Sequence, residues 1–329
     1  MKNILITGGA GFIGSHLVDA LLDDPRIGKV RVLDNLSTGF LANISHHWND
    51  PKFEYIKADI CDFDACLKAC KNMDLISHQA ALGSVPRSLK DPIATNATNI
   101  TGTLNIFHAA KETGISRVVY AASSSTYGDS TTLPKVEDQI GKPLSPYAVT
   151  KYVNELYATV YARSFGMELI GLRYFNVFGP RQSPNGAYAA AIPLFIKQLQ
   201  QGESPVINGD GSHSRDFTYV ANAVQANLLA LFSDNKDALG EVFNIAYGQQ
   251  TSILELFETL RRELNIDANP TFGPERKGDI PHSLANIEKA KRLLGYFPNL
   301  SVAEGLKKTV AWHMNKEGLI IPKSFKSLK

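Results

Sequence analysis

Tyr147 and Lys151 are the pair of residues whose types and spacing most directly suggest chemistry. They follow Ser145-Pro146, a combination typical of a helix start, and a spacing of four residues places both side chains on one helix face. A tyrosine base near pH 7 needs its pKa lowered from about 10 by roughly three pH units, or about 4 kcal/mol. An ammonium group about 4 Å away supplies energy of that order at an effective dielectric constant near 20. The pair therefore predicts a general base whose pKa Lys151 lowers; the alternative is an ordinary amphipathic helix, on which this spacing is common.

A run of hydroxyl side chains, Ser123-Ser124-Ser125-Thr126, stands ahead of this pair. It follows an apolar segment, 117–122, which is typical of a strand, so the hydroxyls are expected at the carboxyl edge of a sheet, where open α/β folds bind ligands. The alternative is a serine-rich turn without a ligand. A strand-end serine followed within about 25 residues by Tyr147 favours a role in orienting an alcohol.

Glycines at 8, 9, 11 and 14 lie between the first predicted strand and a helix that begins near Ser15. A strand-to-helix turn of this composition lets backbone N–H groups and the helix dipole face a pyrophosphate. Asp34 ends the second predicted strand, twenty residues beyond Gly14, where a carboxylate can bind ribose hydroxyls. Because Asp34 would repel a 2′-phosphate and residues 35–39 include no Lys or Arg, NAD is predicted over NADP.

Short apolar strands alternating with helices must position these residues, which predicts an α/β doubly wound parallel sheet of Rossmann type. The predicted strands are 2–7, 29–33, 54–58, 75–78, 117–122 and 168–174, and the predicted helices include 15–22, 93–113, 146–165, 192–201 and 252–264. The regularity loosens after about Gly179. We therefore expect a NAD-binding domain at 1–178 and a smaller C-terminal α/β domain for substrate at 179–329, with some segments returning to the sheet.

Composition excludes several other classes of protein. The 329 residues carry a net charge of +2 and are 44% hydrophobic, which indicates a folded, soluble chain and gives no sign of nucleic-acid or membrane binding. The spacing of Cys61, Cys66 and Cys70 fits neither a zinc pair nor a disulfide framework, so reduced cysteines and no metal are predicted. With no signal peptide recognised, the expected compartment is the cytoplasm.

The segments TGGAGFIG, SSSTYG, YAVTK and RYFNVFGP resemble the extended short-chain dehydrogenase/reductase family, and in particular its nucleotide-sugar 4-epimerases. The segments ALGSVPRS, NGAYAA, INGDGSHSRDF and GDIPHS are similar to those of bacterial 4-epimerases of UDP-N-acetylated hexosamines and their uronic acids. The resemblance implies NAD-dependent C4 epimerisation of UDP-GlcNAc and UDP-GalNAc through a transient 4-ketone, in the supply of surface-polysaccharide precursors. It also implies a homodimer formed through helices 93–113 and 146–165.

The same resemblance implies a role for individual residues. Ser123, Tyr147 and Lys151 are the expected catalytic residues. NAD is expected at Gly8, Gly11, Phe12, Ile13, Asp34, Asn35, Ser37, Thr38, Gly39, Asp59, Ile60, Gln79, Ala80, Thr98, Tyr147, Lys151 and Tyr174. The UDP-sugar is expected at Ser84, Ser123, Ser124, Ser125, Tyr147, Asn176, Ala190, Asn208, Arg215, Arg276, Asp279 and Ser283. Ser283 is the expected reason for accepting N-acetylated sugars, because relatives restricted to plain hexoses place a tyrosine there; the alternative is that Ser283 caps a helix.

Relatives that dehydrate or decarboxylate their substrate carry an acidic residue just before the Tyr-Gly pair. Residues 123–126 include no carboxylate, which favours epimerisation. A two-step dehydrogenase would need a nucleophilic cysteine, and all three cysteines lie near the third predicted strand. The open alternatives are a uronic acid substrate, another nucleotide-sugar enzyme, a net dehydrogenase, and a silent NAD-binding protein.

Overall fold

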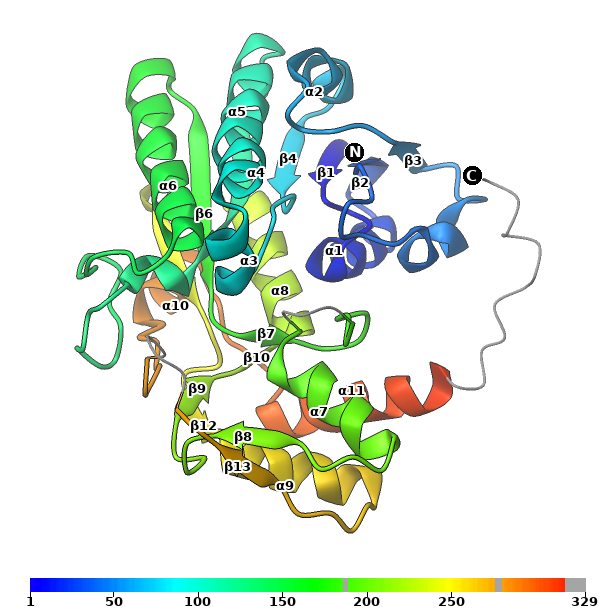
Figure 1. Ribbon diagram of the computed structural model, residues 1–329. Coiled ribbons are helices and arrows are strands. Elements are labelled where there is room, and N and C mark those ends of the chain that lie inside the picture. Colours follow the sequence, from blue (N-terminus) through cyan, green and yellow to red (C-terminus); the bar gives the residue numbers. More distant parts are fainter. Residues whose placement is uncertain (186–188, 276–279, 317–329) are drawn as a thin grey trace.

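Seven parallel strands form the central sheet of the computed structural model, in the order β11-β6-β5-β4-β1-β2-β3 (Figure 1). The strands are β1 (Lys2–Thr7), β2 (Ile27–Leu33), β3 (Phe53–Ile56), β4 (Leu75–His78), β5 (Arg117–Ser123), β6 (Glu168–Tyr174) and β11 (Val242–Ile245). The structure describes residues 1–185, 189–275 and 280–316. The order reverses between β1 and β4, and in this fold ligands bind at that point, outside the carboxyl ends of the strands.

Helices cover both faces of the sheet, which confirms the predicted doubly wound fold (Figure 1). One face carries α2 (Phe63–Cys70), α5 (Gly102–Glu112) and α6 (Pro146–Phe165), and the other carries α1 (Phe12–Leu22), α8 (Val220–Leu231) and α10 (Glu288–Leu294). Each layer has its own apolar core against the sheet. Strands buried on both faces explain the nearly continuous apolar runs in the sequence.

The predicted helix at 93–113 is interrupted in the structure. It consists of α4 (Pro92–Asn96), a π-helical turn (Ala97–Thr101) and α5, and it follows the short helix α3 (Val85–Lys90). A Cβ at Gly102, the first residue of α5, would lie 2.5 Å from the Ile60 side chain, so α5 approaches the loop after β3 closely. The π turn contains Thr98, and such turns occur frequently at functional sites.

The second half of the chain builds a separate apolar core, drawn below the sheet in Figure 1. Its helices are α7 (Ala191–Gln200), α9 (Ile253–Leu264) and α11 (Val302–Lys316). Its short strands pair as β7 (Val177–Phe178) with β10 (Thr218–Tyr219), β8 (Val206–Asn208) with β13 (Thr271–Gly273), and β9 (Ser214–Asp216) with β12 (Gln250–Ser252). From this half, β11 joins the sheet, and α8 and α10 cover one of its faces. The domain boundary at residue 178 stays a prediction.

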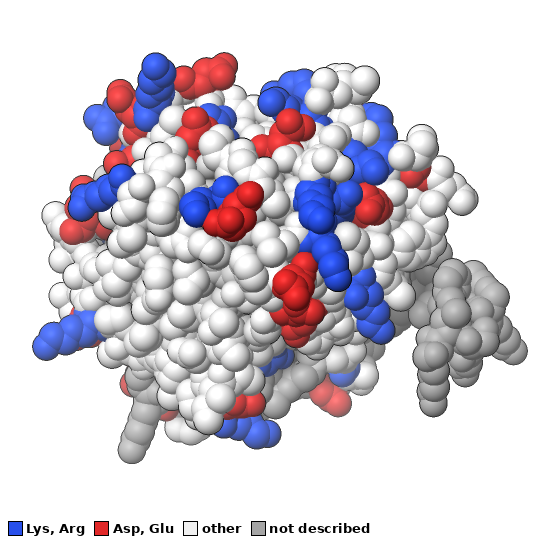
Figure 2. Space-filling model, turned by 90° about the horizontal axis from the view of Figure 1, so that it is seen from above, with Lys and Arg blue, Asp and Glu red and all other residues white. Residues whose placement is uncertain are grey.

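Charged side chains of both signs lie next to one another on the face seen in Figure 2, with a broad area free of them in its left half. No patch of a single sign dominates that face. Among the described residues, no helix is both long enough and apolar enough to cross a membrane.

Candidate functional site

The glycine turn after β1 is packed too tightly for side chains. Gly8 has φ +71°, and a Cβ at Gly14 would lie 2.2 Å from the carbonyl oxygen of Gly8. The Gly11 N–H donates to that oxygen over 3.0 Å, and Gly11 is the N-cap of α1 without a side-chain cap. The turn therefore leaves the first N–H groups of α1 for an anionic ligand, as a pyrophosphate requires.

A cavity of about 120 Å³ lies beside this turn, at the point where the strand order reverses. It is lined by Gly8, Gly11, Leu33, Asp34, Asn35, Ser37, Thr38, Ala58, Ile60, Gln79, Ala80, Ala81 and Thr98. Asp34 is held there by the N–H groups of Ala10 and Leu36, at 2.9 and 2.8 Å. Burial raises the pKa of Asp34, and these two hydrogen bonds oppose the rise.

The other predicted cofactor residues surround this cavity without lining it. The Asp59 carboxylate accepts a hydrogen bond from Asn35 Nδ2 over 2.7 Å, and Gly39 lies against Ala10. Phe12 and Ile13 begin α1, and their side chains pack against the core of the second half.

Tyr174 connects β6 to the cavity through a buried polar network. Its hydroxyl donates to Gln79 Oε1 over 3.1 Å and accepts from Asn227 Nδ2 over 2.7 Å. Gln79 Nε2 in turn donates to Asn227 Oδ1 over 2.9 Å. Asn227, on α8, was not predicted, because only the packing of α8 against the sheet brings it there.

Ser123 and Tyr147 meet at the carboxyl end of β5. Their side chains are hydrogen-bonded, which lowers the pKa of Tyr147, but burial has the larger effect and raises it overall. Ser123 Oγ also accepts hydrogen bonds from the N–H and Oγ of Ser125, at 3.1 and 2.9 Å. Ser124 and Ser125 begin the 3₁₀ turn η4 (Ser124–Tyr127) and are half-buried.

The Lys151 ammonium has a hydrogen-bond partner that was not predicted. It is buried and donates to the Ala121 carbonyl oxygen over 2.8 Å. Burial lowers the pKa of Lys151 to about 8, with Glu155 opposing the change. The hydrogen bond with Ser123 lowers the pKa of Tyr147, and the expected effect of Lys151 on Tyr147 stays a prediction.

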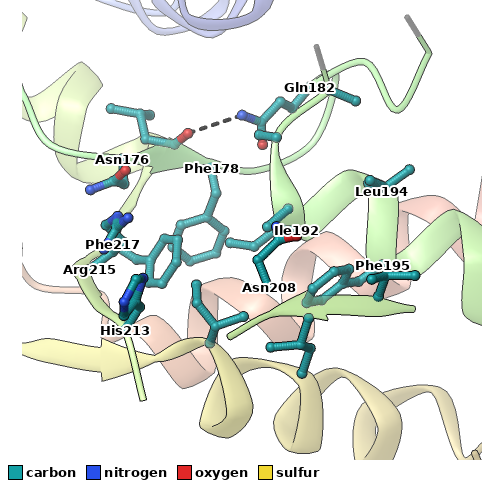
Figure 3. Close-up of a pocket in the computed structure, with 17 residues that line it drawn as sticks. Asn176, Phe178, Gln182, Ile192, Leu194, Phe195, Asn208, His213, Arg215 and Phe217 are labelled. Carbon is teal, nitrogen blue, oxygen red and sulfur yellow. Dashed lines mark hydrogen bonds between the residues drawn. The ribbon is translucent and has the colours of Figure 1, made fainter. Parts of the chain in front are cut away.

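A second cavity, of about 300 Å³, lies between β7, α7, β8 and β9 (Figure 3). Four predicted substrate residues line it: Asn176, Ala190, Asn208 and Arg215. Figure 3 shows Arg215 and His213 together at one end and Gln182 at the other, with Phe178 and Phe217 between the polar groups. His213 and Gln182 were not predicted as site residues, although His213 lies within the segment INGDGSHSRDF. Aromatic walls with a few polar groups are typical of a small-molecule site.

Ser84 and Ser283 lie outside both cavities. Ser84 has φ +99°, a rare and strained backbone conformation for a residue other than glycine. It caps α3 by accepting from the Arg87 N–H over 3.3 Å. Ser283 is half-buried, and its N–H donates to the Ser214 carbonyl oxygen over 3.1 Å. Arg276 and Asp279 lie outside the described residues.

Asp216 fixes the backbone around the end of β9. This fully buried carboxylate accepts hydrogen bonds from the N–H groups of Tyr247, Gly248 and Ala285, at 3.1 to 3.2 Å. Burial raises its pKa to about 7, against the effect of these N–H groups. Arg215 precedes Asp216 in the chain, and Ser283 is two residues from Ala285. One carboxylate therefore holds the segments that carry both side chains.

Residues 4–246 match the NAD dependent epimerase/dehydratase family. The chain belongs to this family. The match confirms an enzyme fold with NAD as cofactor, and it includes the glycine turn, Ser123, Tyr147 and Lys151.

Several members of the family are similar along nearly the whole chain. A putative UDP-glucose 4-epimerase of Methanocaldococcus jannaschii is 40% identical, over 95% of this chain and 98% of its own. A solved UDP-N-acetylglucosamine 4-epimerase of Methanobrevibacter ruminantium, in complex with UDP-N-acetylmuramic acid, is 42% identical with a TM-score of 0.90, covering 96% and 99%. The dTDP-glucose 4,6-dehydratase DesIV of Streptomyces venezuelae, with NAD bound, is 32% identical with a TM-score of 0.88, covering 96% and 98%. These matches do not support the expected similarity to bacterial epimerases in particular.

The glycine turn and Asp34 fit the NAD that the family requires. Side chains would fill the turn at Gly8 and Gly14, so its backbone is shaped for close approach of a phosphate. The Asp34 carboxylate lines the adjoining cavity, and its charge suits ribose hydroxyls and opposes a 2′-phosphate.

Asp34→Ala is expected to remove the preference for NAD over NADP, because it removes the charge that repels the 2′-phosphate. Calorimetry on enzyme stripped of cofactor measures both affinities. Asp34→Asn is the matched control for the two N–H groups that Asp34 binds, because it keeps an acceptor while removing the charge, and it should also lose discrimination. Equal affinity of the parent protein for both cofactors would refute the assignment.

Proposed function

We propose that this protein is a NAD-dependent 4-epimerase that interconverts UDP-N-acetylglucosamine and UDP-N-acetylgalactosamine. The C4 alcohol is oxidised to a ketone and then reduced on the opposite face, so there is no net redox change. We propose further that the products of this reaction are precursors of surface polysaccharides.

The observation that carries the reaction type is the set of side chains at the end of β5. Ser123, η4 and Tyr147 present hydroxyl groups there, and residues 123–126 include no carboxylate. Dehydration and decarboxylation each need an additional acid or base beyond the oxidation of C4. DesIV, a dehydratase, shares the fold, so the fold alone does not distinguish these reactions. The absence of a carboxylate in that stretch favours epimerisation.

Residues of the chain itself accept and return the proton of the C4 alcohol. Tyr147, hydrogen-bonded to Ser123, is placed to accept that proton and to give it back. Ser123 orients the alcohol and then the ketone by hydrogen bonding. Lys151 holds a buried positive charge at the Ala121 carbonyl, close to this end of β5. Bound at the glycine turn and Asp34, NAD would supply the hydride acceptor for C4 and a positive charge that favours the tyrosinate.

Small side chains support an N-acetylated substrate: Ala189 and Ala190 line the second cavity. Ser283 is half-buried outside this cavity, and its proposed place beside the sugar, where a phenol ring would occupy the space of an acetamido group, rests on the resemblance of the segment GDIPHS. The alternative role of Ser283 as a helix cap does not apply, because α10 begins at Glu288 with Ile287 as its N-cap. The similar solved epimerase, named for UDP-N-acetylglucosamine, also supports this class of substrate.

Ser283→Tyr is expected to suppress interconversion of UDP-GlcNAc and UDP-GalNAc by about tenfold or more, while retaining activity on UDP-Glc and UDP-Gal. The size follows from a few unfavourable contacts in a substrate pocket, each worth about 1–3 kcal/mol. Initial rates with each sugar measure the change, and Ser283→Thr, which adds one methyl group, is the conservative control. Normal turnover of acetylated substrates by Ser283→Tyr would contradict the proposed role.

The function itself is tested by incubating the purified protein, without added NAD, with UDP-GlcNAc, UDP-Glc and the uronic acid of UDP-GlcNAc in separate reactions. Products are resolved by NMR. Epimerisation of UDP-GlcNAc at the highest rate supports the proposal. Preference for the uronic acid would select the alternative substrate, and release of reduced cofactor would indicate a net dehydrogenase.

We also propose that two copies associate through α3, α4 and α6, which pack against one another. On α6, Val149, Leu156 and Val160 share one face and are 45–52% exposed. On the adjoining α3 and α4, Leu89 and Ile93 are 64% and 81% exposed. An apolar face of this kind, contributed equally by both copies, suits a two-fold interface.

Leu156→Glu is expected to shift the protein from dimer to monomer, because it places a charge in the apolar interface. Light scattering after size-exclusion chromatography measures the mass. Phe297→Glu changes a similarly exposed residue (61%) outside these helices and should leave the dimer intact. A parent protein that is monomeric at all concentrations would exclude this interface.

A further inference from the structure

Asp19, His46 and His47 form a cluster between α1 and the turn at Ser45–His47 that the proposed reaction does not use. His47 Nε2 and His46 Nε2 lie 2.7 and 3.0 Å from the same atom, Asp19 Oδ1. One ligand atom from each residue lies within 4.8 Å of the others. None of the three residues lines either cavity.

Different parts of the chain fix the members of this cluster. Asp19 lies on α1, and the two histidines end the 3₁₀ turn η2 (Ser45–His47), which follows the fully buried Ile44. The His47 side chain is only 16% exposed, while that of His46 is 49% exposed. The cluster is therefore anchored on the His47 side and open to solvent on the His46 side.

The second carboxylate oxygen of Asp19 has its own partner. Arg181 Nη2 lies 2.7 Å from Asp19 Oδ2, which leaves Oδ1 directed to the two imidazoles. His16, also on α1, is the remaining titratable neighbour, and its Nε2 lies 2.9 Å from the Pro180 carbonyl oxygen. Hydrogen bonds from both histidines and the charge of Arg181 lower the pKa of Asp19 in spite of its burial.

We propose that Asp19, His46 and His47 bind a divalent transition metal of the zinc class, with a remaining coordination position open to water. Two imidazole nitrogens and one carboxylate oxygen are a donor set that zinc accepts. Ligand atoms about 2.0–2.2 Å from a tetrahedral zinc ion lie about 3.3–3.6 Å from one another, so each histidine nitrogen needs to move less than about 1 Å from Asp19 Oδ1. Binding displaces the protons on the two Nε2 atoms.

A metal at this place acts on structure and not on the reacting atoms. It connects α1, which begins at the glycine turn, to η2. Through Asp19 and Arg181 it also reaches the segment before Gln182, which lines the second cavity. We therefore expect the metal to stabilise the folded protein.

Calorimetric titration of the full chain with Zn²⁺, after treatment with a chelator, tests the proposal. One equivalent should bind, and His46→Ala and His47→Ala should each weaken the affinity at least about tenfold. His108→Ala is the matched control, because His108 is a half-exposed histidine on α5 beside Glu112. It should leave binding unchanged.

Thermal unfolding gives a second readout that does not depend on activity. Zn²⁺ should raise the Tm of the parent and of His108→Ala, and should leave the Tm of His46→Ala unchanged. His46 has the most solvent-exposed side chain of the three residues, so His46→Ala should disturb folding least. Unchanged affinity in both cluster variants, or an equal loss in His108→Ala, would overturn the proposal.

Discussion

Tyr147→Phe is expected to lower turnover at least about a hundredfold while NAD stays bound. A positioned acid–base group contributes about 10²–10⁴ in rate. This substitution removes the Tyr147 hydroxyl, which is hydrogen-bonded to Ser123. The phenyl ring is retained, so packing at the start of α6 should persist. Steady-state rates with UDP-GlcNAc, together with absorbance of the cofactor retained on the purified protein, measure the two effects separately.

Tyr157→Phe provides the matched control for Tyr147→Phe, because it removes a hydroxyl from the same helix at a residue that packs on the α5 side of the sheet. Its turnover should stay near that of the parent. A Tyr147→Phe enzyme with near-parental turnover would exclude this tyrosine as the base. Loss of bound NAD in that variant would mean that the ring hydroxyl serves binding and not proton transfer.

Gly14→Ala is expected to abolish detectable NAD binding. The added methyl group would lie 2.2 Å from the Gly8 carbonyl oxygen and 2.9 Å from the Gly9 Cα. Backbone atoms on both sides cannot move away cheaply, so α1 must shift from the turn and carry its N–H groups with it. Affinity measured by calorimetry, with circular dichroism to establish that the chain is folded, separates loss of the site from loss of the fold.

Two other glycine variants serve as controls for the effect of Gly14→Ala on NAD binding. At Gly83 a Cβ would meet nothing within 4 Å, so Gly83→Ala should bind NAD as the parent does. At Gly11 the nearest atom is the Gly8 oxygen at 3.1 Å, so Gly11→Ala should show an intermediate loss. Tight NAD binding by Gly14→Ala would show that the turn does not depend on this contact.

Local sequence was sufficient to predict the cofactor half because its determinants are close together in the chain. Predicted strands 2–7, 75–78 and 168–174 match β1, β4 and β6 residue for residue, and others differ by two residues or fewer at an end. The apolar runs and the glycines after β1 act within one strand and one turn. The same holds for Ser145, which caps α6 by accepting from the Ala148 N–H over 3.1 Å.

The parts that sequence missed depend on contacts between distant segments. The break before α5 reflects Ile60 packing on Gly102, and Asn99 in the π turn donates to the Leu82 carbonyl oxygen over 3.1 Å. The direction of Lys151 depends on the Ala121 carbonyl, thirty residues away in the chain. Asn227 joins Gln79 from a helix almost 150 residues further along the chain. Periodicity and spacing carry no information about such pairings.

The hydrogen bonds of Asp216 hold the backbone near residue 283 independently of the side chain at that position. Because the carboxylate holds the N–H groups of Gly248 and Ala285, the course of segment 281–285 does not depend on what residue 283 presents. Residue 283 can then vary while Arg215, anchored beside the same carboxylate, keeps its place at the Pro281 carbonyl oxygen, 3.0 Å away. With residue 283 beside the sugar, as we propose, a single substitution there would change substrate preference without disturbing the fold of this segment.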